Sequence, residues 1–219
     1  MDDERARARS ERKHDPSRLL TLSDGVFAII LTLLVLELQI PELSNGEGLR
    51  EALREVRPSF IAFLISFVVV AMAWAGHRDL FTLIRRTDRV LIWLNLLLLL
   101  PLSILPFGAS LLSRYDREPT ALKLYGLMLI AIALTRLTIW VYAIRRPYLL
   151  FEPVDKGSRW MGMVVVLVPA LAYAIAIALS DSAPSVSLAI YALAPFVYFF
   201  SVTFIRNTAE PGASDQDFT

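Results

Sequence analysis

The sequence predicts an all-α integral membrane protein with six transmembrane helices and both termini in the cytosol. The first observation is composition: 56% of the 219 residues are hydrophobic, whereas a soluble domain has about 45–50% apolar residues. The second is that these residues form blocks long enough to cross a bilayer core of about 30 Å as helices. The third is the unequal distribution of lysine and arginine between the loops, which sets the orientation.

Each apolar block is about 20 residues long, the length that a membrane-spanning helix needs. Short polar segments separate the blocks, so residues 18–206 are expected to form a single transmembrane domain. Residues 1–17 are charged and lack the apolar centre of a signal peptide, which indicates a cytosolic tail. Residues 207–219 are expected to form a polar cytosolic C-terminal tail. The blocks cover residues 18–38, 58–77, 90–112, 121–143, 160–179 and 185–205.

The basic residues indicate which side of the membrane is cytosolic. Fifteen lysines and arginines flank the side that carries the N-terminal tail, and six flank the other side. Because positively charged loops remain in the cytosol, both termini are predicted to be cytosolic. In the first external loop, Leu49, Leu53 and Val56 recur at helical spacing between charged residues. This pattern predicts a short interfacial helix that ends before Pro58, although a plain connecting loop fits the segment nearly as well.

The composition also excludes several kinds of site. The chain has no cysteine, so it has no disulfide, thiol nucleophile or thiolate metal site. Its two histidines, His14 and His77, make a zinc site unexpected. The carboxylates are not accompanied by a nucleophile motif, so an enzyme is not expected. We therefore expect no cofactor, no bound metal and no nucleic-acid partner.

Five polar residues near the cytosolic ends of the first three blocks are candidates for a functional site, because polar groups are costly in lipid. Ser23 and Asp24 lie about one turn inside the first block, His77 ends the second, and Asn95 lies a turn or two into the third. Arg18 lies at the same level. This shared depth predicts either a hydrogen-bonded cluster that locks three helices together or a proton relay or ion-binding site.

The apolar part of the first block has its own pattern. Ile29, Leu33 and Leu36 share one helical face, with Thr32 beside them. In most membrane proteins such a stripe faces lipid or another helix, and the alternative is a hydrophobic constriction that closes a pore by dewetting. Glu37, at the external end, is either an interfacial charge or an acidic residue at a pore mouth that concentrates cations.

The stretch RLLTLSDGVFAIILTLLVLEL, residues 18–38, resembles the first-helix signature of the transmembrane-protein-175 family of potassium channels. That signature is an arginine, three residues, Phe-Ser-Asp and an apolar run. Leu22 stands where the family usually has phenylalanine, a substitution that keeps bulk and apolarity. The segments RPSFIAFLISFVVVAMAWAGHRDLF and LIWLNLLLLLPLSILPF resemble the second and third helices, so the resemblance covers roughly residues 18–107.

The resemblance implies an architecture that residue spacing could not show. Family members with one six-helix repeat assemble as homotetramers, in which the first helix of each subunit lines a central pore. The implied constriction consists of three large apolar residues with an adjacent polar layer, namely Ile29, Leu33, Leu36 and Thr32.

The resemblance also implies a role for the polar cluster. Arg18, Ser23 and Asp24 would lie outside the narrowest part of the pore. There they would contact His77 and Asn95 and hold the pore helix in place. This role agrees with the shared depth of the five residues.

The function implied is passive, potassium-preferring cation conduction in the plasma membrane of a prokaryote. The expected partners are other copies of the chain, the lipid bilayer, and potassium or other monovalent cations or protons. The sequence has no Thr-Val-Gly-Tyr-Gly segment, so a filter of backbone carbonyls is not expected and selectivity should be modest. The alternative function is a proton-coupled secondary transporter that uses Asp24 and His77. A non-transporting scaffold ranks last, because no soluble partner-binding domain is recognisable.

Overall fold

The computed structural model describes residues 15–38 and 48–209, and it describes side-chain surroundings for all of these except residue 52 and residues 197–209. Regular structure in these segments is helical, apart from one isolated antiparallel bridge between Ile84 and Leu150. The prediction of an all-α fold is therefore confirmed. Most of the two predicted tails, as well as the Arg206 side chain, lies outside the described residues. The helices are α2 (Ser17–Val35), α3 (Leu49–Glu55), α4 (Arg57–Thr82), α5 (Arg89–Arg114), α6 (Pro119–Ile144), the 3-10 helix η1 (Pro147–Leu149), α7 (Lys156–Leu179) and α8 (Pro184–Ala209).

Each of the six long helices coincides with a predicted apolar block. Five of them, α2 and α4 to α7, are long and apolar enough to cross a membrane. Helix α8 is 26 residues long, and its described apolar portion is the shorter segment Pro184–Phe196. The differences from prediction are at the helix ends: α4 continues from the predicted end at residue 77 to Thr82. Charged residues end an apolar block, but they do not end the helical hydrogen bonding of the backbone.

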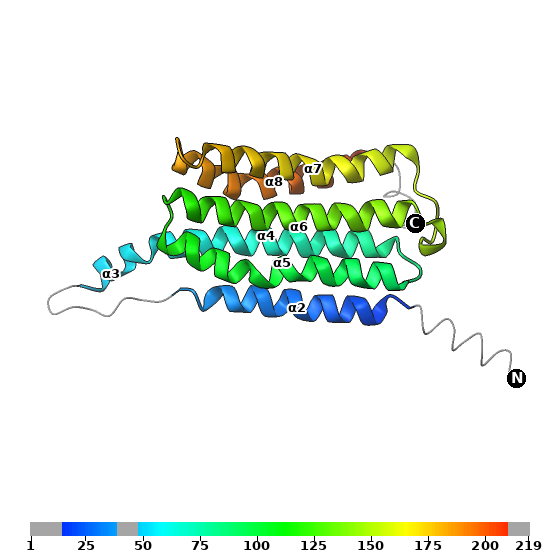
Figure 1. Cartoon of the computed structure of the whole chain (residues 1–219), viewed down its shortest axis with the longest axis horizontal. Helices are drawn as coiled ribbons and strands as arrows, with labels where there is room; N and C mark the ends of the chain where they lie inside the picture. Colours follow the sequence, from blue (N-terminus) through cyan, green and yellow to red (C-terminus); the bar gives the residue numbers. More distant parts are fainter. Residues whose placement is uncertain (1–14, 39–47, 210–219) are drawn as a thin grey trace, which may run out of the picture.

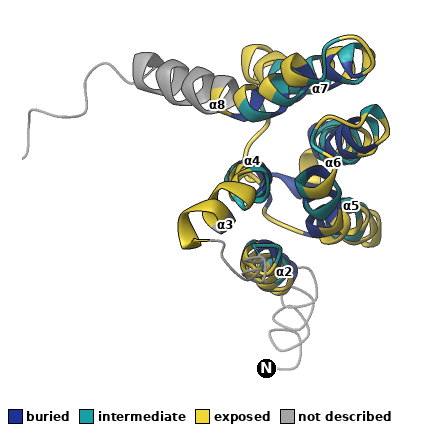
Figure 2. Ribbon diagram, turned by 90° about the vertical axis from the view of Figure 1, so that its left-hand side faces the viewer, coloured by how far each residue is buried: buried dark blue, intermediate teal, exposed yellow. Residues whose placement is uncertain are grey.

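The helices form a bundle in which α2 lies at one edge (Figure 1). Helix α2 packs against α4 and α5, which together with α6 form the middle of the bundle. Helices α7 and α8 pack against each other and cover the opposite side. The first external loop was expected to form either a short interfacial helix or a plain connection. It contains the helix α3, which lies next to the start of α4 (Figure 2). Because α2 has neighbours on one side only, its other face is not covered by the subunit.

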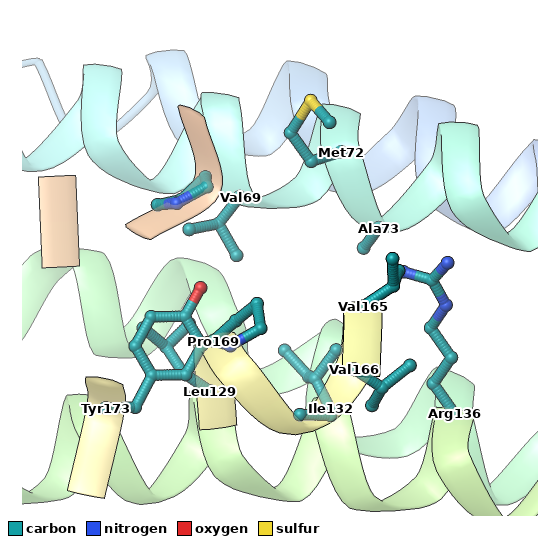
Figure 3. A pocket seen from close by; sticks show the side chains of 12 residues that line it. Val69, Met72, Ala73, Leu129, Ile132, Arg136, Val165, Val166, Pro169 and Tyr173 are labelled. Atoms are coloured by element: carbon teal, nitrogen blue, oxygen red, sulfur yellow. The ribbon is translucent and has the colours of Figure 1, made fainter. Parts of the chain in front are cut away.

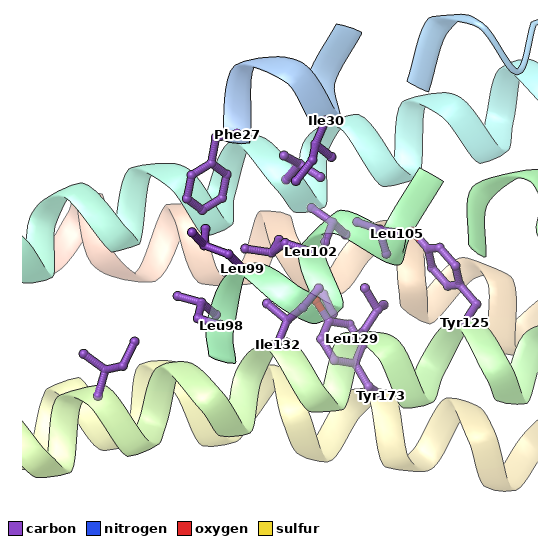
Figure 4. Packing of buried hydrophobic residues seen from close by; sticks show 14 of the residues in the cluster. Phe27, Ile30, Leu98, Leu99, Leu102, Leu105, Tyr125, Leu129, Ile132 and Tyr173 are labelled. Atoms are coloured by element: carbon purple, nitrogen blue, oxygen red, sulfur yellow. The ribbon is translucent and has the colours of Figure 1, made fainter. Parts of the chain in front are cut away.

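The core lies where α2, α4, α5 and α6 meet. Phe27 and Ile30 of α2 point toward Leu98, Leu99 and Leu102 of α5 (Figure 4), and all five side chains are buried. Deeper layers are formed by buried residues of α6 and α7, which include Leu129, Ile132 and Tyr173. Lipid chains are as apolar as these side chains, so the contacts stabilise the bundle chiefly through close van der Waals packing.

Hydroxyl groups link the helices where the packing is tight. The Ser66 and Tyr125 hydroxyls lie 2.9 Å apart and join α4 to α6. The Tyr191 hydroxyl of α8 donates to the Leu122 carbonyl of α6 at 2.9 Å. Gly126 lies so close to Tyr191 that a Cβ atom there would overlap its hydroxyl. The glycine therefore permits the approach of α6 and α8. Each such hydrogen bond contributes roughly 0.6 kcal/mol in a membrane protein.

Asp88 joins three segments at one end of the bundle. It is the N-cap of α5, where its Oδ1 accepts from the Leu91 amide at 2.8 Å. Its Oδ2 accepts from the hydroxyls of Tyr142 and Tyr148, each at 2.7 Å. Burial opposes ionisation of this carboxyl, but these hydrogen bonds outweigh that effect and hold its pKa below the ordinary value. The bond to Asp88 in turn raises the pKa of the Tyr148 hydroxyl.

We predict that Asp88→Ala destabilises the protein by roughly 1–3 kcal/mol at neutral pH, because it removes a helix cap and leaves two hydroxyls without their acceptor. The matched control is Asp155→Ala, since Asp155 caps α7 by accepting from the Ser158 amide at 3.0 Å but, among the described residues, bonds no tyrosine hydroxyl. The folded-state pKa of Asp88 is depressed, so its stabilisation is complete above the unfolded-state value of about 4 and is lost as pH falls further. Thermal unfolding of the detergent-purified variants between pH 7 and pH 3 measures both effects. Equal losses in the two variants would contradict the prediction.

Candidate functional site

Helix α2 has one buried face and one exposed face. The buried residues recur at intervals of three or four, which places them on a single face against α4 and α5. The predicted constriction residues lie on the other face: Ile29 is 58% exposed, Leu33 42% and Leu36 65%. In a subunit taken alone, these large apolar side chains have no protein neighbour that covers them. The buried residues are Leu19, Ser23, Phe27, Ile30 and Leu34.

The exposed stripe is longer than the sequence pattern indicated. Leu22 is 49% exposed and continues the stripe by nearly two turns toward the start of α2. Gly25 lies between Leu22 and Ile29 on this face, and nothing lies within 4 Å of where its Cβ would be. A period of seven residues would have identified Leu22, because it precedes Ile29 by two turns. The exposed face of α2 therefore carries bulky apolar side chains on both sides of Gly25, where there is no side chain.

Thr32 is exposed, and its hydroxyl donates back to its own helix. Its Oγ1 lies 2.8 Å from the Ile29 carbonyl and 3.2 Å from the Ala28 carbonyl. Since the hydroxyl hydrogen is used in these bonds, the oxygen lone pairs are left for groups outside the helix. Thr32 therefore offers an acceptor on the exposed face. Glu37 follows the end of α2, is half-buried, and donates its amide to the Leu34 carbonyl at 3.3 Å.

Ser23, Asn95 and His77 form a continuous hydrogen-bonded chain between α2, α5 and α4. The Ser23 hydroxyl donates to the Leu19 carbonyl at 2.9 Å. The Asn95 amide nitrogen donates to the Ser23 oxygen at 2.9 Å, and the Asn95 oxygen lies 2.7 Å from His77 Nε2. All three side chains are fully or almost fully buried. The structure thus brings together three of the five residues of the predicted polar cluster.

The direction of this chain fixes the protonation of His77. Ser23 uses its hydrogen on a backbone carbonyl and Asn95 uses its amide on Ser23, so the Asn95 oxygen must accept a hydrogen from His77. His77 is therefore the tautomer with hydrogen on Nε2. Its Nδ1 is buried and has no hydrogen-bond partner in the described part of the chain. The ring stacks on Phe81, with centroids 4.4 Å apart, and contacts Phe27 at 5.6 Å.

Asp24 and Arg18, the other members of the predicted cluster, do not join this chain. The Asp24 carboxylate accepts from the Trp74 indole at 2.9 Å instead of contacting His77 or Asn95. Arg18 is exposed and forms no hydrogen bond or ion pair with the other described residues. Sequence reasoning did not assign Trp74 to the site. The signal was available, because Trp74 precedes His77 by three residues and so lies on the same face of α4.

Arg136, which lies inside the fourth predicted span, packs against the same region of α4 from the other side. Its guanidinium occupies the space beside Gly76 that a Cβ atom would need. It also lines a mostly apolar cavity of about 70 Å³ together with residues such as Val69, Ile132 and Tyr173 (Figure 3).

Among the residues that the structure describes, no three His, Asp or Glu side chains are placed to hold a metal ion.

Comparison with known proteins places these features in a family. The sequence profile of the family described as endosomal/lysosomal potassium channel TMEM175 matches residues 18–106, which agrees with the extent of the resemblance at residues 18–107. A potassium channel of Streptomyces collinus is 31% identical over 192 residues, covering 86% of this chain and 93% of that protein. The human endosomal/lysosomal proton channel TMEM175 is 30% identical over 167 residues, and the match covers 33% of its length.

The fold is also found among solved structures. The crystal structure of a lysosomal potassium-selective channel TMEM175 homolog from Chamaesiphon minutus matches with a TM-score of 0.76 and 29% identity, over 84% of this chain and 96% of that one. These relatives are named as channels, which agrees with the prediction that the chain is not an enzyme. On the identity and coverage of these matches, the chain belongs to the TMEM175 family.

Proposed function

We propose that this chain is a passive, potassium-preferring cation channel in which four copies surround a central pore lined by α2. The observation that carries the proposal is the exposed apolar stripe on a helix that has subunit neighbours on one side only. A helix at the edge of its own bundle can meet three symmetry-related copies around an axis. The family and the relatives named as potassium channels support potassium as the permeant ion.

Ile29, Leu33 and Leu36 are proposed to form the constriction. At a rise of 1.5 Å per residue, these side chains span about 10 Å along the helix. In a tetramer they would give three successive apolar rings, and such rings stop ions by excluding the water that hydrates them. Thr32 would supply an oxygen acceptor beside the rings. Glu37 would lie at the external mouth, where its charge attracts cations.

The proposed topology has six spans with both termini in the cytosol of a prokaryote. Five helices meet the length and hydropathy that a span requires, and α8 has the length of a sixth. An even number of spans returns the chain to the side where it began. The excess of basic residues on that side supports a cytosolic location. The transmembrane domain then covers residues 18–206, between cytosolic tails at 1–17 and 207–219.

The chain of Ser23, Asn95 and His77 is proposed to lock the pore helix onto the bundle. Each member forms a hydrogen bond to a side chain of another helix, and Ser23 also bonds its own backbone, which suits a structural role. The transporter alternative requires Asp24 and His77 to exchange or share protons. It has less support, since Asp24 is bonded to Trp74 and His77 is held by Asn95.

We predict that Leu33→Ser increases potassium flux, because a polar ring retains water that an apolar ring excludes. A barrier lowered by about 1.4 kcal/mol raises the flux about tenfold. The measurement is potassium efflux from liposomes that contain the purified protein. Leu97→Ser is the matched control, since Leu97 is a similarly exposed leucine on α5. Unchanged flux in Leu33→Ser, or an equal increase in both variants, would remove Leu33 from the constriction.

We predict that Asn95→Leu weakens assembly, because it removes the acceptor of the buried His77 Nε2–H and the donor to the Ser23 oxygen. A buried polar group left without its partner costs roughly 1–3 kcal/mol. Size-exclusion chromatography with light scattering and thermal unfolding in detergent would show less tetramer and a lower midpoint. The matched control is Ser103→Ala, since Ser103 bonds only the backbone of its own helix. A stable tetramer with altered pH dependence of flux would favour a proton relay over a lock.

We predict that Asp24→Asn retains potassium flux in the absence of a proton gradient. The amide oxygen of asparagine still accepts from the Trp74 indole, so the local structure should persist. A coupled transporter would instead show saturable transport in the wild type that depends on the proton gradient, and this dependence would disappear in the variant. Flux with and without an imposed gradient distinguishes the two functions.

A further inference from the structure

A groove lies between the first turns of α4, the loop between α5 and α6, and the first turns of α8. These segments meet at the same end of the bundle (Figure 1). The groove has a volume of about 470 Å³, within the range of about 300–1,000 Å³ typical of ligand sites. None of its lining residues belongs to the exposed stripe of α2 or to the polar chain at His77, and the proposed conduction does not use it.

The two ends of the groove differ in chemistry. Arg57, Arg117 and Ser185 line it where α4 and α8 begin. Ile61 and Ile65 lie one and two turns further along α4, and Leu188 lies about one turn further along α8. Because α4 and α8 both begin at this end, their apolar residues extend in the same direction into the bundle. The groove is thus charged at its mouth and apolar in its interior.

Helix α3 indicates that the charged mouth lies at the membrane surface. Its Leu49 and Leu53 are exposed, with Arg50 and Arg54 between and beside them. A short helix of this kind lies along the boundary between lipid headgroups and acyl chains. Arg57 follows α3 after a single residue, so it lies close to the headgroup level. The apolar interior of the groove then lies at the depth of the acyl chains.

The charge at the mouth selects an anion. Arg57 and Arg117 are exposed, and neither forms a salt bridge with a carboxylate of the described residues. Asp116, also in the lining, offsets one of the two positive charges. The N-terminus of α8 contributes a partial positive charge. Two guanidinium groups bind phosphate through paired hydrogen bonds.

We propose that this groove binds one anionic phospholipid, with its phosphate between Arg57 and Arg117 and an acyl chain along Ile61, Ile65 and Leu188. A second copy of the chain fits the groove less well. Docking protein here would remove two guanidinium groups from water, and buried charges without good partners are strongly destabilising. A lipid leaves these groups at the aqueous surface and supplies both the phosphate and the apolar tail. The site is independent of whether the chain conducts ions.

The test is native mass spectrometry of the full chain in detergent with added phosphatidylglycerol or phosphatidylcholine. The wild type should retain phosphatidylglycerol in preference to phosphatidylcholine. In Arg57→Gln/Arg117→Gln, binding of phosphatidylglycerol should fall roughly tenfold. The control Arg54→Gln/Arg114→Gln removes two exposed arginines of the same side that do not line the groove, and it should bind as the wild type does. Equal binding by all three proteins, or equal loss in both variants, overturns the proposal.

A second pair of variants tests the apolar part of the groove. Ala189→Trp should fill the interior and reduce phosphatidylglycerol binding, because Ala189 lines the groove. Leu193→Trp should not, because Leu193 is an exposed residue of the same helix outside the lining. Unchanged binding in Ala189→Trp overturns the proposal. A smaller oligomer in Ala189→Trp with intact lipid binding also overturns it, because the groove would then be a contact between copies of the chain. Glycerol 3-phosphate should not displace the lipid, and full displacement would reduce the site to a headgroup contact.

Discussion

The attachment of α2 through a single face is the constraint on which the rest of the structure depends. Within a membrane, apolar side chains gain little by leaving lipid for protein, so a helix is held by close packing and by hydrogen bonds. Helix α2 has both: Phe27 and Ile30 are almost completely buried against the bundle, and Ser23 is bonded to Asn95 of α5. His77 continues this bond to α4. One side of α2 is therefore fixed, and the other side is not covered by the described residues of the subunit, where we propose that neighbouring copies, ions and water meet it.

Contacts at both ends of the bundle hold the other helices in position around α2. Asp88 ties the loop between α4 and α5 to Tyr142 and Tyr148 at one end. At the other end, the Lys123 ammonium lies 2.7 Å from the Asp181 carboxylate and connects α6 to the turn before α8. This exposed pair contributes little stability in water, and its Asp181 lies three residues before the start of α8 at Pro184. The position of α8 in turn defines the groove that we assign to a phospholipid.

Much of the polar cluster was predictable from polar residues inside apolar blocks of the sequence. The shared depth of Ser23, His77 and Asn95 predicted that they would lie together, and they form one hydrogen-bonded chain. The same reasoning expected Asp24 and Arg18 to contact them, whereas Asp24 is bonded to Trp74 and Arg18 is exposed. Depth along a span gives the height of a residue in the membrane. It does not give the direction in which the residue faces, and that direction decides its partner.

The sequence by itself determined that the chain is helical, where each apolar block lies, which side carries the excess positive charge, and which family the first three helices resemble. The resemblance rests on the motifs of the first three helices. The other properties depend on local composition and on the thickness of a bilayer, so a single chain suffices to infer them. Only the tertiary structure decided which face of α2 is covered, which nitrogen of His77 carries hydrogen, and that Arg57 and Arg117 line one groove. These features depend on contacts between residues far apart in the chain. Such contacts are set by how helices rotate and pack against one another, and hydropathy contains no information about that rotation.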